Sequence, residues 1–137
     1  MSRNVCMNYC TYNHKDTSII ISIRSSWDNE FPILPCNSKN NVKAVLYLSF
    51  DDVEKDKEPK YCMSEEDGKK VSEFVNKWYD KVDRIIVHCD GGISRSAGVC
   101  AGIMKAKEGD DMPIFKNKSK HPNMTCYLHT LKGFNYI

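Results

Sequence analysis

The stretch that decides the fold is Ile85-Ile86-Val87-His88-Cys89-Asp90-Gly91-Gly92-Ile93-Ser94-Arg95-Ser96-Ala97-Gly98. It runs from β-branched residues typical of a buried strand, through a turn with two glycines, into small residues that favour the start of a helix. Open α/β sheets bind anions at such a junction, because turn N–H groups and a helix N-terminus converge there. Five residues separate Cys89 from Arg95, enough to wrap a tetrahedral dianion with backbone amides.

Three strands are predicted around this junction. Thr17–Ile23 and Lys43–Leu48 are rich in β-branched and aliphatic residues, and Asp83–His88 leads directly into the junction. The intervening segments Ser25–Asn41 and Asp51–Met63 are polar and contain proline, so they are predicted loops.

Helices are predicted to alternate with these strands. Ser64 starts the first, because the acids that follow it resemble a capping box. An apolar stripe at helical spacing follows, made of Val71, Phe74, Val75 and Trp78. The second helix runs from about Ser94 to Lys107 and is closed by Gly109, and after a loop at 113–122 the last runs from Asn123, its cap, to Gly133. The alternation predicts an α/β domain with a central, largely parallel sheet flanked by helices.

Length and composition predict a single domain over residues 1–137, with residues 1–16 expected to be irregular. A net charge of +2 without a basic block argues against a nucleic-acid partner, and the longest apolar runs are too short for a membrane span or an export signal. The seven cysteines are an odd number, and their spacing is not that of a disulfide-rich scaffold. We therefore expect free thiols and a reducing, cytoplasmic location. The sequence does not indicate an oligomeric state.

Each residue type in the junction has a chemical reason to be there. A free cysteine is only about 3% thiolate at neutral pH, but converging amides and a helix dipole can lower a thiol pKa to roughly 3.5–7.5. Gly91 and Gly92 permit the tight turn and let the backbone approach a phosphate. Arg95 offers a planar fork for two phosphate oxygens, and Ser96 is placed to hydrogen-bond Cys89 when that sulfur becomes a leaving group.

The junction resembles the active-site loop of the protein-tyrosine phosphatase superfamily, through His88-Cys89-x5-Arg95-Ser96 with Gly92. Its sequence Gly-Ile-Ser-Arg-Ser is closest to the small dual-specificity-like branch. The resemblance implies a protein-tyrosine or dual-specificity phosphatase that works through a cysteinyl-phosphate intermediate, without a cofactor or metal. It implies a phosphorylated protein or small aryl phosphomonoester as substrate. It also implies that His88 lies under the loop and shapes it. The phosphate-binding residues would be Asp90, Gly91, Gly92, Ile93, Ser94 and Arg95.

The resemblance also implies a general acid on a loop after an earlier strand. Asp52 is favoured, because it lies just beyond Lys43–Leu48 at the matching place. Asp51 is the main alternative. Only one of the two can be the proton donor, and the other is then a solvated loop acid. Asp56 is the least favoured candidate. A proton donor of this kind typically contributes about 10²–10⁴ in rate.

Other readings stay open at this point. A rhodanese-like sulfurtransferase also holds a Cys in a loop of amides, and a non-catalytic phosphoprotein-binding module would share the fold. Cys6, Cys10 and His14 lack an evident fourth ligand for zinc, so no metal site is predicted. Cys100 and Trp78 are expected to pack in the core. Because Arg95 is the loop's only cation and Asp90 is acidic, phosphoprotein-like monoesters are favoured over polyphosphorylated inositols.

Overall fold

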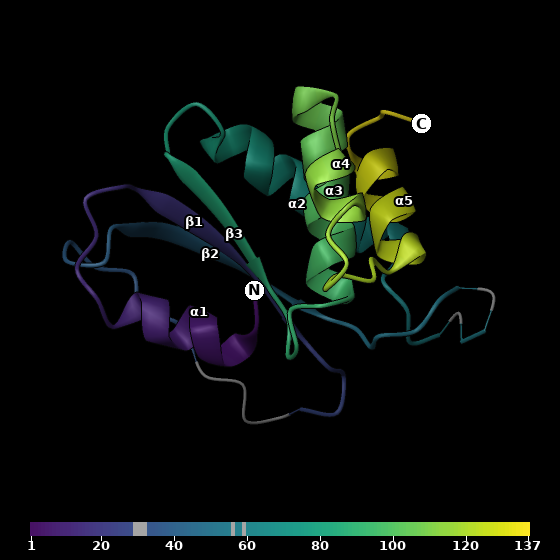
Figure 1. Cartoon of the computed structure of the whole chain (residues 1–137), viewed down its shortest axis with the longest axis horizontal. Helices are drawn as coiled ribbons and strands as arrows, with labels where there is room; N and C mark the ends of the chain where they lie inside the picture. The colour runs from purple at the N-terminus through teal and green to yellow at the C-terminus, as the bar shows by residue number, and fades with distance from the viewer. Residues whose placement is uncertain (29–32, 56, 59) are drawn as a thin grey trace.

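The computed structural model describes residues 1–28, 33–55, 57–58 and 60–137. Within these residues the sheet consists of three parallel strands, β1 (Ser18–Arg24), β2 (Val42–Ser49) and β3 (Arg84–His88), in the order β2-β1-β3. The helices are α1 (Arg3–Cys10), α2 (Glu65–Trp78), α3 (Arg95–Glu108), α4 (Met112–Phe115) and α5 (Met124–Gly133). Helix α1 lies on one face of the sheet, and α2, α3 and α5 lie on the other (Figure 1).

The central strand β1 is buried on both faces. Successive side chains of a strand point to opposite faces, so a strand covered on both sides reads as a continuous apolar run. Two clusters of buried side chains lie on opposite faces of the sheet. Ile20 packs into the smaller cluster, between the sheet and α1, whereas Ile21 and Ile23 pack into the larger cluster, between the sheet and α2, α3 and α5. All three are fully buried.

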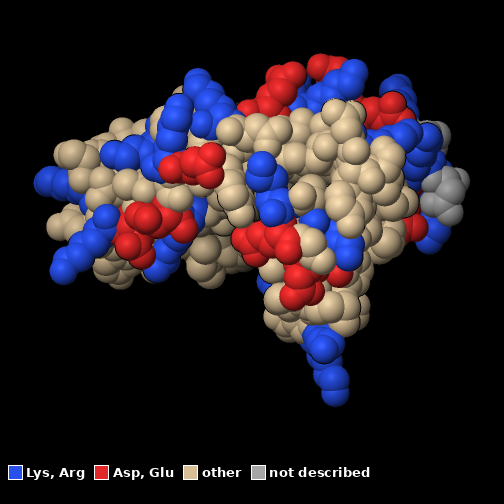
Figure 2. Space-filling view, turned by 90° about the horizontal axis from the view of Figure 1, so that it is seen from above, with Lys and Arg blue, Asp and Glu red and all other residues tan. Residues whose placement is uncertain are grey.

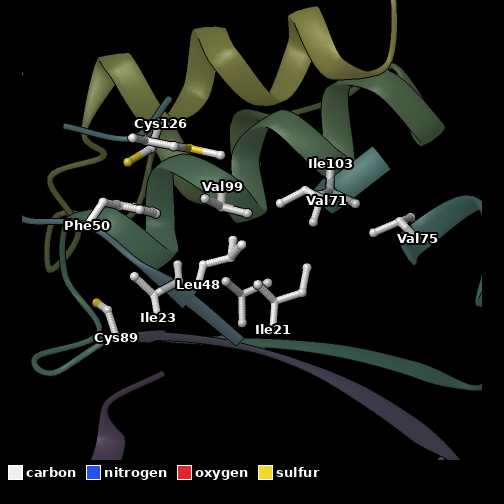
Figure 3. Close-up of a cluster of buried hydrophobic side chains, with 12 residues drawn as sticks. Ile21, Ile23, Leu48, Phe50, Val71, Val75, Cys89, Val99, Ile103 and Cys126 are labelled. Carbon is white, nitrogen blue, oxygen red and sulfur yellow. The ribbon is translucent and has the colours of Figure 1, made fainter. Parts of the chain in front are cut away.

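The larger cluster anchors the junction after β3. Figure 3 shows Cys89 and Phe50 at one end of this cluster and Val75, from α2, at the other. Cys126 contributes to it from α5 and Val99 from α3. Cys89 is therefore anchored in the larger of the two clusters of buried side chains.

The parallel sheet and the predicted strands and helices are confirmed. Ser64 and Asp67 form the capping box, with the Ser64 hydroxyl 3.0 Å from the Asp67 N–H and the Asp67 carboxylate 3.1 Å from the Ser64 N–H. Gly109 ends α3 in the left-handed conformation, with φ of 76°. The Asn123 side chain accepts a hydrogen bond from the Cys126 N–H at 3.1 Å and so caps α5.

Three expectations differ from the structure. Residues 3–10 are not irregular but form α1, capped by Ser2, which buries Cys6 and Cys10 against the sheet. The loop predicted at 113–122 contains part of α4. Trp78 is half-buried, with the Lys77 and Lys81 ammonium groups near its ring, because the apolar stripe of α2 ends one turn earlier.

Helix α5 approaches its neighbours at glycines. A Cβ on Gly98 of α3 would lie 2.4 Å from the Asn123 carbonyl oxygen, and one on Gly68 of α2 would lie 2.1 Å from the His129 carbonyl oxygen. Only glycine allows backbones to come this close. The start of α5 is therefore held against the start of α3.

Positive and negative side chains are interspersed on the face seen in Figure 2. This distribution fits the small net charge of +2. Among the helices of the described residues, none combines the length and apolarity needed to cross a membrane.

Candidate active site

Cys89 lies between the end of β3 and the start of α3, where two groups stabilise its sulfur. The Ser96 hydroxyl oxygen is 3.3 Å from Cys89 Sγ, and the Gly92 N–H donates to the same sulfur at 3.3 Å. Burial alone would raise the pKa of this thiol, but the hydrogen bonds from Ser96 and Gly92 and the charge of Arg95 outweigh it, so the pKa of Cys89 lies below its ordinary value. The sulfur is thus disposed to ionise and act as a nucleophile.

The Arg95 guanidinium joins the ends of all three strands. Its Nη1 donates to the Ser25 hydroxyl at 3.1 Å and to the Phe50 carbonyl at 3.0 Å, just beyond β1 and β2. Its Nη2 donates to the Asp90 carboxylate at 3.4 Å. Because the side chain is buried and held by fixed partners, its fork is pre-positioned.

His88 lies under the loop and is fully buried. Its Nε2 is 2.7 Å from the Ser22 hydroxyl of the neighbouring strand, and its Nδ1 is 3.4 Å from the Cys89 carbonyl oxygen. Burial lowers the pKa of His88 to about 4. A neutral imidazole therefore supports the loop from below at neutral pH.

Met1–Arg3 lies alongside the loop and shapes its glycine turn. The Cys89 N–H donates to the Met1 carbonyl and the Arg3 N–H donates to the Asp90 carbonyl, each at 3.2 Å. Gly92 has a φ of 70°, and a Cβ there would lie 2.5 Å from Met1 C and from Ser2 N. Both the conformation and the lack of space require glycine at this position.

The two candidate acids, Asp51 and Asp52, have different hydrogen-bond partners in the structure. The Asp52 carboxylate accepts hydrogen bonds from the Ser94 hydroxyl at 2.7 Å and from the Asn123 side-chain amide at 3.0 Å, so it contacts the loop. The Asp51 carboxylate instead accepts from the N–H and the hydroxyl of Ser26, both at 2.8 Å. Asp51 therefore fixes the turn after β1. Asp56 lies outside the described residues.

Most amides of the loop have no hydrogen-bond acceptor among the described residues. Within the part of the chain that the structure describes, the N–H groups of Gly91, Ile93, Ser94 and Arg95 donate no hydrogen bond. Unpaired N–H groups in the loop that begins at Cys89, with the buried guanidinium of Arg95, are the kind of donor that suits a tetrahedral oxyanion.

The remaining cysteines take no part in this arrangement. Cys6, Cys10, Cys36, Cys100 and Cys126 form no disulfide. His14 stacks on Tyr9, with ring centroids 3.7 Å apart, and its Nε2 is 2.7 Å from the Tyr9 carbonyl oxygen. No group of three or more His, Cys, Asp or Glu is placed to hold a metal ion within the described ranges. Cys100 is half-buried and packs against the larger core cluster.

Comparison with known proteins identifies the architecture. No known family model and no curated protein sequence matches the chain. Among solved structures, Tk-PTP in its active form has a TM-score of 0.62 and 15% identity, and the match covers 99% of this chain and 88% of that one. The fold is that of the small tyrosine phosphatases.

Two further structures show the range of proteins that share this phosphatase fold. The human tyrosine phosphatase-like serine/threonine/tyrosine-interacting protein has a TM-score of 0.61 and 19% identity, over 85% of this chain and 76% of that one. A mouse protein named as a putative dual specificity phosphatase, complexed with zinc tungstate, has a TM-score of 0.57 and 18% identity, over 86% of this chain and 70% of that one. At these identities the likeness establishes the fold alone.

Two residues of the site do not stand out in the sequence. Ser25 contacts Arg95, and the only signal for it is its place at the carboxyl end of a strand, where open α/β sheets gather functional groups. Asn123 is recognisable as a helix cap, but its contact with Asp52 depends on how α5 packs.

Proposed function

We propose that the protein hydrolyses phosphomonoesters as a cysteine-dependent tyrosine or dual-specificity phosphatase. The observation that carries this proposal is the thiol of Cys89, with its lowered pKa, set among the free loop amides and the buried guanidinium of Arg95. This arrangement offers a nucleophile and the donors for the developing oxyanion in one place.

In the first step the Cys89 thiolate attacks phosphorus, and the bond from phosphorus to the ester oxygen breaks as the S–P bond forms. The loop amides and the Arg95 guanidinium bind the equatorial oxygens, where charge develops. Asp52 supplies a proton to the leaving oxygen. Its contacts with Ser94 and Asn123 support this role over Asp51, whose carboxylate is bound to Ser26.

In the second step water attacks the phosphocysteine and its proton passes to the Asp52 carboxylate. The S–P bond breaks, and the sulfur of Cys89 leaves as a thiolate. The Ser96 hydroxyl, 3.3 Å away, stabilises that leaving thiolate by donating a hydrogen bond. Phosphate is released, and the enzyme regains its starting protonation state. The chemistry uses no cofactor, and it requires the reduced thiol that a cytoplasmic setting maintains.

The charges around the loop favour a singly phosphorylated group on a protein. Arg95 is the cation within the loop, and the Asp90 carboxylate pairs with it at 3.4 Å. Because Asp90 offsets part of the Arg95 charge, the charges within the loop itself match a single phosphate, and phosphotyrosine, alone or with phosphoserine and phosphothreonine, is the proposed substrate.

Hydrolysis of p-nitrophenyl phosphate by the wild type and three variants tests the mechanism. We expect Cys89→Ser to abolish turnover and Asp52→Asn to lower kcat by about 10²–10⁴, the usual contribution of a general acid. Asp51→Asn is the matched control and should retain most of the activity. If Asp51→Asn is inactive and Asp52→Asn is not, the assignment of the acid is wrong.

The same proteins distinguish the competing functions. A phosphoprotein-binding module would bind phosphotyrosyl peptide but show no turnover in the wild type. A rhodanese-like enzyme would transfer sulfur from thiosulfate to cyanide, and the wild type should not. Either result, in a folded protein free of phosphatase activity, would overturn the proposal.

A further inference from the structure

A segment far along the chain is bonded to the outer side of the loop. We call residues Lys120–Asn123 the strap. The Lys120 ammonium donates to the Gly92 carbonyl, the His121 N–H donates to the Ile93 carbonyl at 3.0 Å, and the Asn123 N–H donates to the Ser94 carbonyl at 3.0 Å. Three consecutive loop carbonyls are therefore held by one short segment.

Holding these carbonyls fixes the direction of the amides that follow them. In a trans peptide unit the C=O and the N–H of the next residue point in opposite directions. The carbonyls of residues 92–94 are bound on the strap side, so the N–H groups of residues 93–95, which belong to the proposed oxyanion donors, point away from the strap. Those three N–H groups donate to no acceptor in the described part of the protein.

The loop needs such a constraint because of its composition. Gly91 and Gly92 are adjacent, and glycine loses more backbone freedom on ordering than any other residue. Met1–Arg3 holds the loop on one side through its bonds to Cys89 and Asp90. The strap holds it on another side.

We propose that Lys120 is a positioning residue, whose hydrogen bond to the Gly92 carbonyl keeps the loop in its oxyanion-binding conformation before any ligand arrives. This inference rests on the proposed function of the loop. It concerns Lys120 because the other two bonds of the strap come from the backbone, and only this one depends on the identity of a side chain. The side chain is half-buried, and the charge on the donor strengthens the bond.

Position alone would also allow Lys120 to contact the substrate. It lines an open cleft of about 510 Å³ next to Ser94 and Asp52. The two roles differ in their consequences. A positioning residue affects every oxyanion that the loop binds, whereas a substrate contact affects only substrates that extend into the cleft.

Lys120→Met tests the role, with Lys118→Met as the matched control, since Lys118 is an exposed lysine of the same region and loses the same charge. Two readouts are measured: kcat/KM for p-nitrophenyl phosphate, and tungstate affinity by calorimetry. Both should fall about tenfold in Lys120→Met, as expected for one charged hydrogen bond that is partly exposed. Both should persist in Lys118→Met, and Lys120→Arg should recover most of the loss because it keeps a charged donor.

Each alternative outcome overturns the proposal. Unchanged tungstate affinity in Lys120→Met would show that the bond does not position the loop. A loss that disappears in about 0.5 M salt would indicate electrostatic attraction of the anion instead, because such attraction is screened. A loss confined to phosphopeptides, with the small anion unaffected, would assign Lys120 to substrate contact.

Two further measures keep the test decisive. If Lys120→Met does not fold, Lys120→Gln replaces it. The same fall in kcat/KM and in tungstate affinity is expected, because the glutamine side chain is uncharged and shorter than that of lysine. If the wild type hydrolyses no aryl phosphate, the proposed function fails, but tungstate affinity still reports on the strap.

Discussion

Acidification should destabilise this protein through one buried residue, His88. The perturbation is a change from about pH 7.5 to about pH 5, a range in which an ordinary histidine takes up a proton. In the folded chain the imidazole of His88 is fully buried between Ser22 and the Cys89 carbonyl, and burial lowers its pKa from 6.5 to about 4.

The sign and size of the effect follow from this lowered pKa. As the pH falls, His88 of the unfolded chain becomes protonated near pH 6.5, whereas His88 of the folded chain stays neutral until about pH 4. The unfolded state therefore binds more protons, and stability falls as the pH falls through this window. The contribution of His88 is fully present above its unfolded pKa. At pH 5 about 2 kcal/mol of it should be lost, because each unit of pKa difference is worth about 1.36 kcal/mol.

Urea denaturation of the wild type and His88→Gln at the two pH values measures this loss. The glutamine keeps a polar group near Ser22 but does not titrate, so the free energy of unfolding should fall by about 2 kcal/mol less than in the wild type between the two pH values. His121→Gln, an exposed histidine, is the control and should retain the wild-type dependence. Equal losses in the wild type and His88→Gln would refute the reasoning.

Three further predictions concern the site itself. Ser96→Ala should raise the pKa of the Cys89 thiol, because it removes a hydrogen bond to the thiolate; the pH dependence of iodoacetamide alkylation measures this, and an unchanged midpoint would contradict it. Gly92→Ala should lower the free energy of unfolding by about 1–3 kcal/mol in denaturation experiments, because its φ of 70° and its contacts exclude a side chain, whereas Gly91→Ala, with only one distant contact at 4.0 Å, should have a much smaller effect. Asn123→Asp keeps the helix-capping oxygen but replaces the amide donor to the candidate acid with a carboxylate. Steady-state kinetics should show kcat lowered about tenfold while stability changes by less than about 1 kcal/mol, and a matching loss of stability would contradict this.

Much of the fold was predictable because its signals are local. The apolar run at Ile19–Ile23 indicates a strand that is covered on both faces, and the structure buries it there. The caps at Ser64 and Asn123 and the left-handed Gly109 are each specified by one or two residues. Such features depend little on the rest of the chain, so a sequence pattern identifies them.

The first helix was not predictable in the same way. Arg3–Cys10 mixes polar and apolar residues without a clear apolar stripe, and its buried side chains, Cys6 and Cys10, are one helical turn apart. This spacing also suits a metal site, so the pattern is ambiguous by itself. The helix is stabilised mainly by packing against Ile20, Leu34 and Val42, which only the folded sheet brings together.

The candidate site also has a part with a local sequence signal and a part that depends on tertiary packing. The Cys89–Arg95 loop is contiguous in sequence, and its spacing predicts its geometry. The choice between Asp51 and Asp52 stays open in the sequence, because adjacent residues differ only in their tertiary partners, Ser26 for one and Ser94 with Asn123 for the other.

The close passage of α5 over Gly68 and Gly98 makes the chemistry depend on distant packing. A side chain at Gly68, on α2 and outside the described site, would collide with the His129 carbonyl oxygen and push α5 away from α2. Because Asn123 is the cap of that helix, its amide would move relative to Asp52. The proton transfer proposed for Asp52 would then change without any substitution near the loop. If the proposed function holds, substitution at these two glycines would lower the catalytic rate while Cys89, Arg95 and Asp52 stay the same.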